Sequence, residues 1–395
     1  MPVQISDGVG RRIAYYRSVV RPKMTQQQLA DAACVALGTI RKIERGERGV
    51  TNATLEAIAD ALGVDSARLR TDRAAAQTRV HEALPALSAA IATYDLPEDG
   101  PVRPLRELRA DVAEAAQWRL AAQYTRIVRN LPDLLPELAR AYHAAPNGDR
   151  AELAGLLVHA YRSADAVAYK FGARDLSARL VDLMRWAVCE AGDPLLTAAV
   201  AYVRTETFFA ARAHSAGLRA LQQALDAGPV PITPQDIAAR GALHMRAAVV
   251  AGRARDSSAA DTHLGEARAL AERVHEDVYC GTAFGPDSVR THEVSVAVRL
   301  GGDHVGRALD VASEWRPPKE LPAERRSGFY IELARAQLWS GLSDDAFESL
   351  KVARRIAPQH TREHPWIRED ASTLRRLKRA ESETLTNFAE WCSAT

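Results

Sequence analysis

Apolar positions in the first 65 residues recur at helical spacing and are separated by turn signals. Four of them define one face of a first helix, which Pro22 ends: Val9, Ile13, Tyr16 and Val20. A segment of this kind predicts a short amphipathic helix that buries one face against its neighbours.

Capping and turn residues separate three further helices. Thr25 can cap a second helix over residues 26–33, because its hydroxyl can accept a hydrogen bond from an N–H group of the first turn. A third helix over about 36–45 follows, and Asn52 can cap a fourth that Gly63 ends. Four helices in such a short stretch predict a small all-helical domain.

The rest of the chain is dominated by longer helical patterns. A helix interrupted near Pro85 precedes the segment DLPEDGPVRP (95–104), which has the prolines, acids and glycine of a linker. Beyond it, nearly every segment has the pattern of an Ala- and Leu-rich amphipathic helix, and the alternation typical of strands is almost missing. We therefore predict an all-α protein in which residues 1–73 form one domain, residues 74–104 a helical linker and residues 105–395 a second domain.

The second domain carries traces of a helical repeat. From Ser327 onward, aromatic, leucine and small residues follow the tetratricopeptide spacing: Tyr330, Leu333, Ala334, Gly341, Ala346, Leu350, Ala353 and Pro358. Weaker versions occur earlier in the chain, at less regular intervals. An irregular helical bundle is the alternative, but the succession of helix pairs with short joints favours a solenoid resembling tetratricopeptide repeats.

The net charge of +2 hides an uneven distribution. Residues 1–73 carry twelve Lys and Arg against eight Asp and Glu, whereas the remainder carries 40 against 42. A basic segment joined to a near-neutral body is typical of a small nucleic-acid-binding domain attached to a larger partner domain. We see no apolar run long enough for a membrane span and no apolar secretory core at the start, so we expect a cytoplasmic protein with no membrane partner. The four cysteines are widely scattered and are not expected to form disulfides.

One segment carries a specific motif, QQQLADAACVALGTIRKIERG (26–46). It resembles the helix-turn-helix of the lambda-repressor-like (XRE) family, with Ala30 where two helices need a small residue to approach. Three apolar residues match the buried positions of that family: Val35, Ile40 and Ile43. The resemblance extends over residues 8–63 and implies a domain of four or five helices that binds double-stranded DNA with its third helix in the major groove.

The resemblance also implies which residues meet DNA. Base-facing positions of the third helix and phosphate-facing positions around it give Arg17, Gln26, Leu37, Gly38, Thr39, Arg41, Lys42, Arg45 and Arg48. Arg41 and Lys42 can donate hydrogen bonds to guanine, whereas Leu37 can offer only an apolar contact. Because one such domain covers little DNA surface, we expect a homodimer on an inverted-repeat operator.

Two positions depart from the family pattern. Cys34 stands where the turn usually has glycine, so we expect a positive φ at this residue and burial of its small apolar side chain. Ala36 replaces the usual Ser or Thr cap, which costs about 1 kcal/mol of helix stability.

Common catalytic motifs are missing from the sequence. It has no GxxxxGK[ST] phosphate loop, no GxGxxG turn after a strand and no GxSxG elbow. His292 and Glu293 begin like a HExxH zinc motif, but Val296 takes the place of the second histidine. His360 and His364 are bracketed by prolines and are expected to form a surface pair. We therefore expect no enzyme, no metal and no cofactor.

A lambda-repressor-like domain followed by tetratricopeptide-like repeats is similar to bacterial regulators whose solenoid binds an effector and controls DNA binding. Actinobacterial regulators of this type are the nearest in character, since 46 Arg against 6 Lys fits a GC-rich genome. The peptide sensors called RRNPP are more distant, because they hold peptide backbones with asparagine amides and the second domain has few asparagines. The competing interpretation is a scaffold whose solenoid binds another protein and whose helix-turn-helix serves docking or dimerisation.

Counting the groove-lining positions of the repeats gives a candidate surface for a small-molecule or peptide effector. Its members are mostly large or charged: Tyr161, Asp165, Tyr169, Tyr202, Glu206, Phe209, Met245, Arg253, Arg290, Glu293, Arg335 and Trp339. About half of these are expected to pack between repeats instead, Tyr202 and Met245 first. The loop over residues 276–288 is long enough to cover the groove as a lid, or else it is a connector.

Overall fold

The structure, a computed structural model, describes residues 9–19, 23–64, 66–69 and 72–377, together with a few residues near the end of the chain: Leu385, Phe388, Ala389, Trp391, Cys392 and Ala394. Within this part of the chain, the regular structure is helical except for one short β-hairpin, so the predicted all-α fold is confirmed. The chain divides into two compact units, one of residues 1–82 and 380–395 and the other of residues 83–379. The boundary after residue 82 falls inside the predicted linker, whereas the boundary after residue 379 falls inside the predicted second domain.

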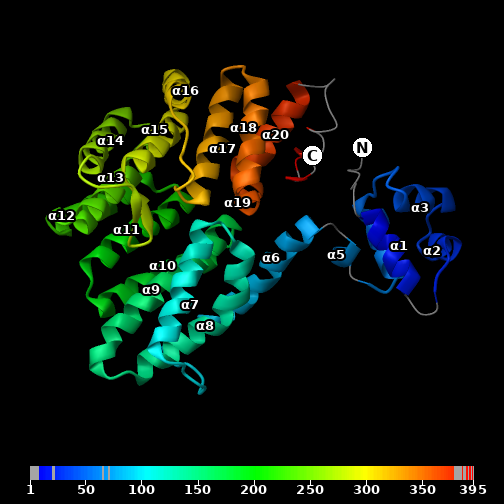
Figure 1. Cartoon of the computed structure of the whole chain (residues 1–395), viewed down its shortest axis with the longest axis horizontal. Helices are drawn as coiled ribbons and strands as arrows, with labels where there is room; N and C mark the ends of the chain where they lie inside the picture. The colour runs from blue at the N-terminus through cyan, green and yellow to red at the C-terminus, as the bar shows by residue number, and fades with distance from the viewer. Residues whose placement is uncertain are drawn as a thin grey trace. The chain divides into compact units, whose positions relative to one another are not determined.

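The first unit is built from short helices joined by tight turns (Figure 1). They are α1 (Val9–Val19), α2 (Gln26–Ala32), α3 (Leu37–Glu44), α4 (Asn52–Ala61), α5 (Ser66–Leu69) and the beginning of α6 (Asp72–Ala90). The apolar faces of α1 to α5 share one core, whose fully buried members include Ile13, Leu29, Ile40, Leu55 and Ile58. Helix α1 approaches α3 so closely that a Cβ on Gly10 would lie 1.9 Å from the carbonyl oxygen of Ile43, so only glycine fits there.

Three details of the helix ends and of α6 test the sequence predictions. Thr25 caps α2 as predicted, and its Oγ1 accepts a hydrogen bond of 3.1 Å from the backbone N–H of Gln28. The cap of α4 is Thr51 and not Asn52, because Thr51 has the extended backbone of a cap and its hydroxyl accepts from the third residue of the helix. The predicted interruption near Pro85 is also wrong, because α6 continues through this residue. A proline removes only one backbone N–H donor, and the hydrogen bonds of the neighbouring turns can hold the helix together.

The second unit is a row of helix pairs. Its elements are α7 (Leu105–Leu120), α8 (Tyr124–Ala144), α9 (Asn147–Lys170), α10 (Arg174–Ala191), α11 (Pro194–Ala210), α12 (His214–Ala227), α13 (Pro234–Ala254), α14 (Ser257–Ala271), β1 (Asp277–Tyr279), β2 (Thr282–Phe284), α15 (Pro286–Leu300), a 3-10 turn (Gly302–His304), α16 (Val305–Glu314), α17 (Ala323–Trp339), α18 (Ser343–Ile356), α19 (Pro358–Glu363) and α20 (Pro365–Leu377). Figure 1 shows the pairs following one another along this unit.

Two layers of helices result from this pairing. Each of α9, α11, α13, α15 and α17, which we call the inner helices, packs on the helix that follows it and on the neighbouring inner helices. The segment whose spacing best fits a repeat forms the pair α17 and α18, joined through Gly341 at φ +79°. The inner helices therefore form one continuous layer with the second helix of each pair behind it.

The row of inner helices curves until distant members meet. Lys170 at the end of α9 forms an ion pair of 2.8 Å with Glu324 at the start of α17. The hydroxyl of Tyr202 in α11 accepts a hydrogen bond of 2.8 Å from Arg325, also in α17. These contacts close the row around the side of the inner helices that we call the inner face.

The loop predicted as a lid or connector is a β-hairpin fixed on the inner face. β1 and β2 pair antiparallel across a turn in which Cys280 and Gly281 have φ of 45° and 73°, the left-handed values that a two-residue hairpin turn needs. The carbonyl of Cys280 accepts a hydrogen bond of 2.6 Å from Arg162, and that of Gly281 accepts one of 2.8 Å from Arg119. Both arginines come from helices more than 100 residues earlier in the chain.

A second contact anchors the same hairpin. Phe284 is fully buried, and its ring occupies the space beside Gly241 of α13, where a Cβ would lie 1.9 Å from the ring. The hairpin is therefore part of the core of the second unit.

Candidate functional site

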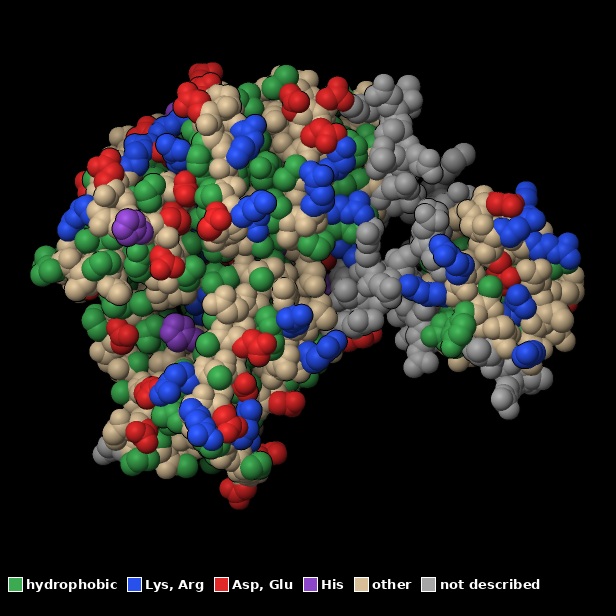
Figure 2. All heavy atoms as spheres, in the orientation of Figure 1, with side chains coloured by type: hydrophobic (Ala, Val, Ile, Leu, Met, Phe, Trp, Pro, Cys, Tyr) green, Lys and Arg blue, Asp and Glu red, His purple; other side chains and the backbone are tan. Residues whose placement is uncertain are grey.

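A basic stripe of Arg41, Lys42 and Arg45 runs along the exposed side of α3, while Ile40 and Ile43 hold the opposite side in the core. Among the described residues, neither Arg41 nor Lys42 forms an ion pair, so both can donate to a base edge or a phosphate. Figure 2 shows Lys and Arg side chains over the surface of this unit.

Glu44 holds the first three helices together from the buried end of α3. Its carboxylate accepts two hydrogen bonds from Arg17 of α1, at 2.7 and 3.0 Å, and one of 2.7 Å from the side-chain amide of Gln26 in α2. Only 6% of the Glu44 side chain is exposed. The hydrogen bonds from Arg17 to this carboxylate raise the pKa of Arg17. The pairing positions the stripe on α3 relative to the start of α2.

This arrangement gives Arg17 a structural role within the unit. Glu44 and the carbonyl oxygen of Met24 engage its guanidinium, and the predicted phosphate contact stays a prediction. The sequence reasoning missed Glu44, although its position one turn after Ile40 is a usable signal for an inward-facing acid.

The remaining predicted DNA contacts lie on or beside the stripe. Gly38, Arg41, Lys42, Arg45 and Arg48 are exposed, and Thr39 is half-buried beside Arg48, whose guanidinium lies 3.4 Å from its hydroxyl. Leu37 is half-buried against the core, so it is less available as an apolar base contact than predicted.

The turn between α2 and α3 confirms one expectation about its unusual residues and corrects another. Cys34 has φ of 51°, as its place in the turn predicts, but its side chain is exposed and not buried. The neighbouring Ala33 supplies the buried apolar contact instead. Ala36 caps α3 without a side-chain hydrogen bond, which confirms the weak cap.

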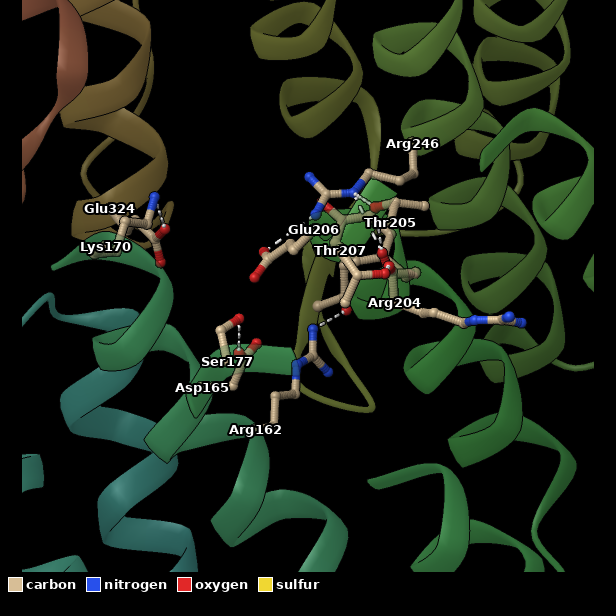
Figure 3. A network of polar contacts seen from close by, with 12 residues as sticks. Arg162, Asp165, Lys170, Ser177, Arg204, Thr205, Glu206, Thr207, Arg246 and Glu324 are labelled. Atoms are coloured by element: carbon tan, nitrogen blue, oxygen red, sulfur yellow. Dashed lines mark hydrogen bonds and ion pairs between the residues drawn. The ribbon is translucent and has the colours of Figure 1, made fainter. Parts of the chain in front are cut away.

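The inner face of the second unit is lined by charged and aromatic side chains from all five inner helices. The set that exchanges contacts or charges across it comprises Arg162, Asp165, Tyr169, Lys170, Tyr202, Glu206, Phe209, Arg246, Arg253, His292, Arg299, Glu324, Arg325, Glu332 and Arg335. Figure 3 shows part of this set: Lys170 beside Glu324, Glu206 beside Arg246, and Arg162 near Asp165.

Several of these groups are reached by solvent although protein surrounds them. The side chains of Lys170 and Glu324 keep exposures of 23% and 26%. Burial is the largest single influence on the pKa of both groups, but their mutual attraction, with smaller contributions from neighbouring charges, outweighs it, so the pKa of Lys170 is raised and that of Glu324 is lowered. Asp165 is more deeply buried, and burial followed by the charge of Glu206 raises its pKa well above the ordinary value. The inner face therefore carries a polar cluster that combines partly exposed and buried charges.

His292 stabilises the guanidinium of Arg325 in this polar cluster. Its Nδ1–H donates to the carbonyl oxygen of Ser288 at 2.7 Å, so its Nε2 lone pair accepts from Arg325 at 3.0 Å. Burial and the charge of Arg325 lower the pKa of His292 to about 3. The ring is therefore a neutral acceptor at physiological pH.

His360 and His364 meet edge to face as predicted, with ring centroids 5.9 Å apart, but the pair does not lie at the surface. His360 is buried because α19 packs on α17, and its Nε2 accepts a hydrogen bond of 3.1 Å from Lys170. Its Nδ1–H then donates to the hydroxyl of Ser327 at 2.7 Å. Burial and the charge of Lys170 lower the pKa of His360 to about 3.

Acidification should destabilise the second unit through these neutral histidines. A histidine with a pKa near 3 in the folded state and about 6.5 when unfolded contributes stability above pH 6.5 that is lost as the pH falls, by about 2 kcal/mol at pH 5. The variant His292→Gln keeps an acceptor for Arg325 but cannot be protonated. We expect its free energy of unfolding to fall by about 2 kcal/mol less than that of the wild type between pH 7 and pH 5. Urea unfolding followed by tryptophan fluorescence measures this difference, and equal pH dependence of the two proteins would contradict it.

The predicted effector residues divide into three groups. The first group belongs to the inner-face set: Asp165, Tyr169, Tyr202, Glu206, Phe209, Arg253 and Arg335. Of these, Asp165, Tyr202, Phe209 and Arg335 are buried, so the expected packing of Tyr202 is confirmed. Tyr161 and Met245 are fully buried in the core. The others lie elsewhere: Arg290 is exposed beside Trp315, Glu293 pairs with Arg268 of α14, and Trp339 is 53% exposed at the end of α17.

On α9 and α13, the predicted inner-face positions lie one residue before the residues that project onto that face. Arg162 and Arg246, and not Tyr161 and Met245, project onto the inner face. Sequence reasoning also missed Lys170, Glu324 and Arg325. Helix α13 carries small apolar residues on every side around Met245. The hydrophobic pattern of this helix therefore does not show which side faces inward.

Two further properties of the described residues bear on function. No cluster of three or more His, Cys, Asp or Glu side chains that could hold a metal ion occurs among them. None of their helices combines the length and apolar character needed to span a membrane.

Comparison with known proteins identifies the first unit. Residues 21–69 match the family model described as Helix-turn-helix, which covers α2 to α5. No curated protein and no solved structure matches the chain. The match confirms the predicted XRE-type helix-turn-helix and, with the stripe on α3, supports a DNA-binding transcription regulator.

Proposed function

We propose that this transcription regulator responds to an effector, which binds on the inner face of the second unit and changes the DNA affinity of the first. The observation that carries the proposal is the cluster of charged groups on the inner face, of which Lys170 and Glu324 remain solvent-reached. Replacing buried ion pairs with apolar side chains is often neutral or stabilising, so a purely structural interior has little need of such charges. A ligand of matching charge supplies a reason for their presence.

An effector can act only through different affinities for two conformations of the protein. The same coupling then makes DNA change the affinity for the effector, by the same factor. The ion pair of Lys170 with Glu324 and the hydrogen bond of Tyr202 with Arg325 join distant inner helices. A ligand bound to the polar cluster would lie beside these contacts. Its binding would therefore favour either the state in which they are formed or the state in which they are broken.

The basic stripe on α3 should carry specific DNA binding. We expect Arg41→Ala and Lys42→Ala each to weaken binding to a selected DNA site by about 1 to 3 kcal/mol, because each removes donors to base edges or to the phosphates beside them. Arg45→Ala should weaken binding to all sequences and flatten the salt dependence by about one unit. Fluorescence anisotropy of the full chain on fragments from upstream of its own gene measures both effects.

Arg219→Ala is the matched control for these variants. Arg219 is exposed on α12, so its substitution removes one positive charge from the protein without touching the first unit. We expect it to leave DNA affinity within about twofold of wild type. Wild-type affinity of all the stripe variants at 150 mM salt would refute the assignment of α3.

We further propose that the protein binds an inverted-repeat operator as a homodimer. One helix-turn-helix domain buries roughly 600 to 1,000 Å² on DNA, which is little for tight specific binding, and two-fold proteins match half-sites about one turn apart. Analytical ultracentrifugation should give twice the 43.0 kDa of the chain at micromolar concentration. A monomer that kept full operator affinity would contradict the proposal.

A further inference from the structure

Arg253 of α13 is a cation without an acidic partner. Among the described residues, its guanidinium forms neither a hydrogen bond nor an ion pair, and its Nε is buried with no acceptor. Its close contact is the ring of Phe209, whose centroid lies 3.8 Å from its central carbon. Burial of such a charge is unfavourable unless something else compensates it.

The nearest charged groups make this setting more positive. The guanidinium of Arg246 lies 5.0 Å from the centroid of the same Phe209 ring. Burial and then the charge of Arg299 lower the pKa of Arg253 to about 10, and Glu332, the acid that acts on it from α17, is already hydrogen-bonded to Arg299 at 3.3 Å. Arg246 is likewise paired with Glu206 at 3.1 Å, so three guanidinium groups from two neighbouring inner helices share two carboxylates.

Two helices of matched spacing hold these groups in a stack. Tyr202 and Phe209 are seven residues apart on α11, and Arg246 and Arg253 are seven residues apart on α13. Arg246 consequently lies near both rings, 4.4 Å from that of Tyr202 and 5.0 Å from that of Phe209, and Arg253 lies on Phe209. Contact with the Phe209 ring fixes the Arg253 guanidinium and leaves its terminal N–H groups available for two oxygens of a carboxylate or phosphate, whereas N–H groups of Arg246 already donate to Thr205 and Glu206.

A purely structural role does not account for the charge at this position. The aliphatic stem of Arg253 could pack on Phe209 equally well as an uncharged side chain of similar length, such as methionine. We propose that Arg253, supported by Arg246 and Arg299, binds an oxyanion of the effector, either a carboxylate or a phosphate. This inference rests on the proposed effector function of the second unit and specifies the chemistry of its ligand.

Anion titrations of the full chain test the site directly. Sodium phosphate and sodium citrate are the probes, at constant ionic strength maintained with sodium chloride, and the thermal unfolding of the second unit is followed by tryptophan fluorescence. We expect at least one probe to raise the unfolding temperature with a saturable dependence on concentration. Saturation with phosphate alone identifies a phosphate ligand, and saturation with citrate alone identifies a carboxylate.

Arg253→Met is the decisive variant. It should weaken the binding of the active probe by about tenfold to a hundredfold, while the protein without anion is at least as stable as wild type, since a partnerless charge has been removed. Arg219→Met, which removes an exposed arginine of α12, should bind the probe like wild type. A structural arginine would instead give an unstable variant with unchanged anion affinity.

Two results would overturn the inference: no saturable response of the wild type to either probe, or equal binding by Arg253→Met and wild type. DNA binding measured on the same samples separates this failure from that of the proposed function. Absence of an anion response with intact DNA binding refutes only the oxyanion site. Absence of DNA binding refutes the proposed regulator function.

Discussion

Replacing Glu44 with alanine should open the first unit while the second stays folded. The change removes the acceptor of two hydrogen bonds from Arg17 and one from Gln26, and it leaves a mostly buried guanidinium without its partner. We expect a loss of about 2 to 4 kcal/mol in the stability of α1 to α3. Hydrogen–deuterium exchange of the full chain resolves the two units, and backbone amides of α1 to α3 should exchange faster by the corresponding factor.

Glu47→Ala provides the matched control for this experiment. Glu47 pairs with Arg45, but both side chains of that pair are more than half exposed, so the change should cost at most about 0.5 kcal/mol. Equal exchange in the two variants would mean that Glu44 does not hold the helices together.

The second large effect is expected at Gly241. A methyl group there overlaps the buried ring of Phe284, so Gly241→Ala must displace the hairpin together with its hydrogen bonds from Arg162 and Arg119. We expect a loss of about 2 to 3 kcal/mol in the free energy of unfolding of the second unit. Urea unfolding followed by tryptophan fluorescence measures it, because most tryptophans lie in that unit: Trp118, Trp186, Trp315, Trp339 and Trp366.

Two further variants identify the cause. Gly265→Ala in α14, where a Cβ meets no other atom within 4 Å, should stabilise the protein by up to about 1 kcal/mol through the better helix propensity of alanine. Adding Phe284→Leu to Gly241→Ala should recover part of the lost stability by making room for the methyl group. If Gly241→Ala were as stable as Gly265→Ala, the hairpin would not be packed on α13 as described.

Local chemistry accounts for what the sequence predicted well. The cap at Thr25 and the positive φ at Cys34 depend on residues within one turn, and the structure has both. The cap of α4 was misplaced by one residue because Thr51 and Asn52 are both good caps and only the backbone decides between them.

Features that depend on contacts between residues far apart in the chain could not be predicted from the sequence. The hairpin turn is fixed by Arg119 and Arg162, which lie 162 and 118 residues earlier in the chain. The buried pairing of Glu44 with Arg17 likewise joins different helices. The inner-face register failed on α13, because its alanine, glycine and valine residues give no clear apolar side.

The most direct test is specific DNA binding by the full-length protein, read through α3. Fluorescence anisotropy at 150 mM salt should compare a duplex selected from the region upstream of its own gene with a random duplex of equal length. We expect the wild type to bind the selected duplex at least about a thousandfold more tightly, and the double variant Arg41→Ala, Lys42→Ala to lose most of that preference. Equal affinity of the wild type for both duplexes, or an undiminished preference in the double variant, would contradict the assignment of this protein as a regulator that reads DNA with α3.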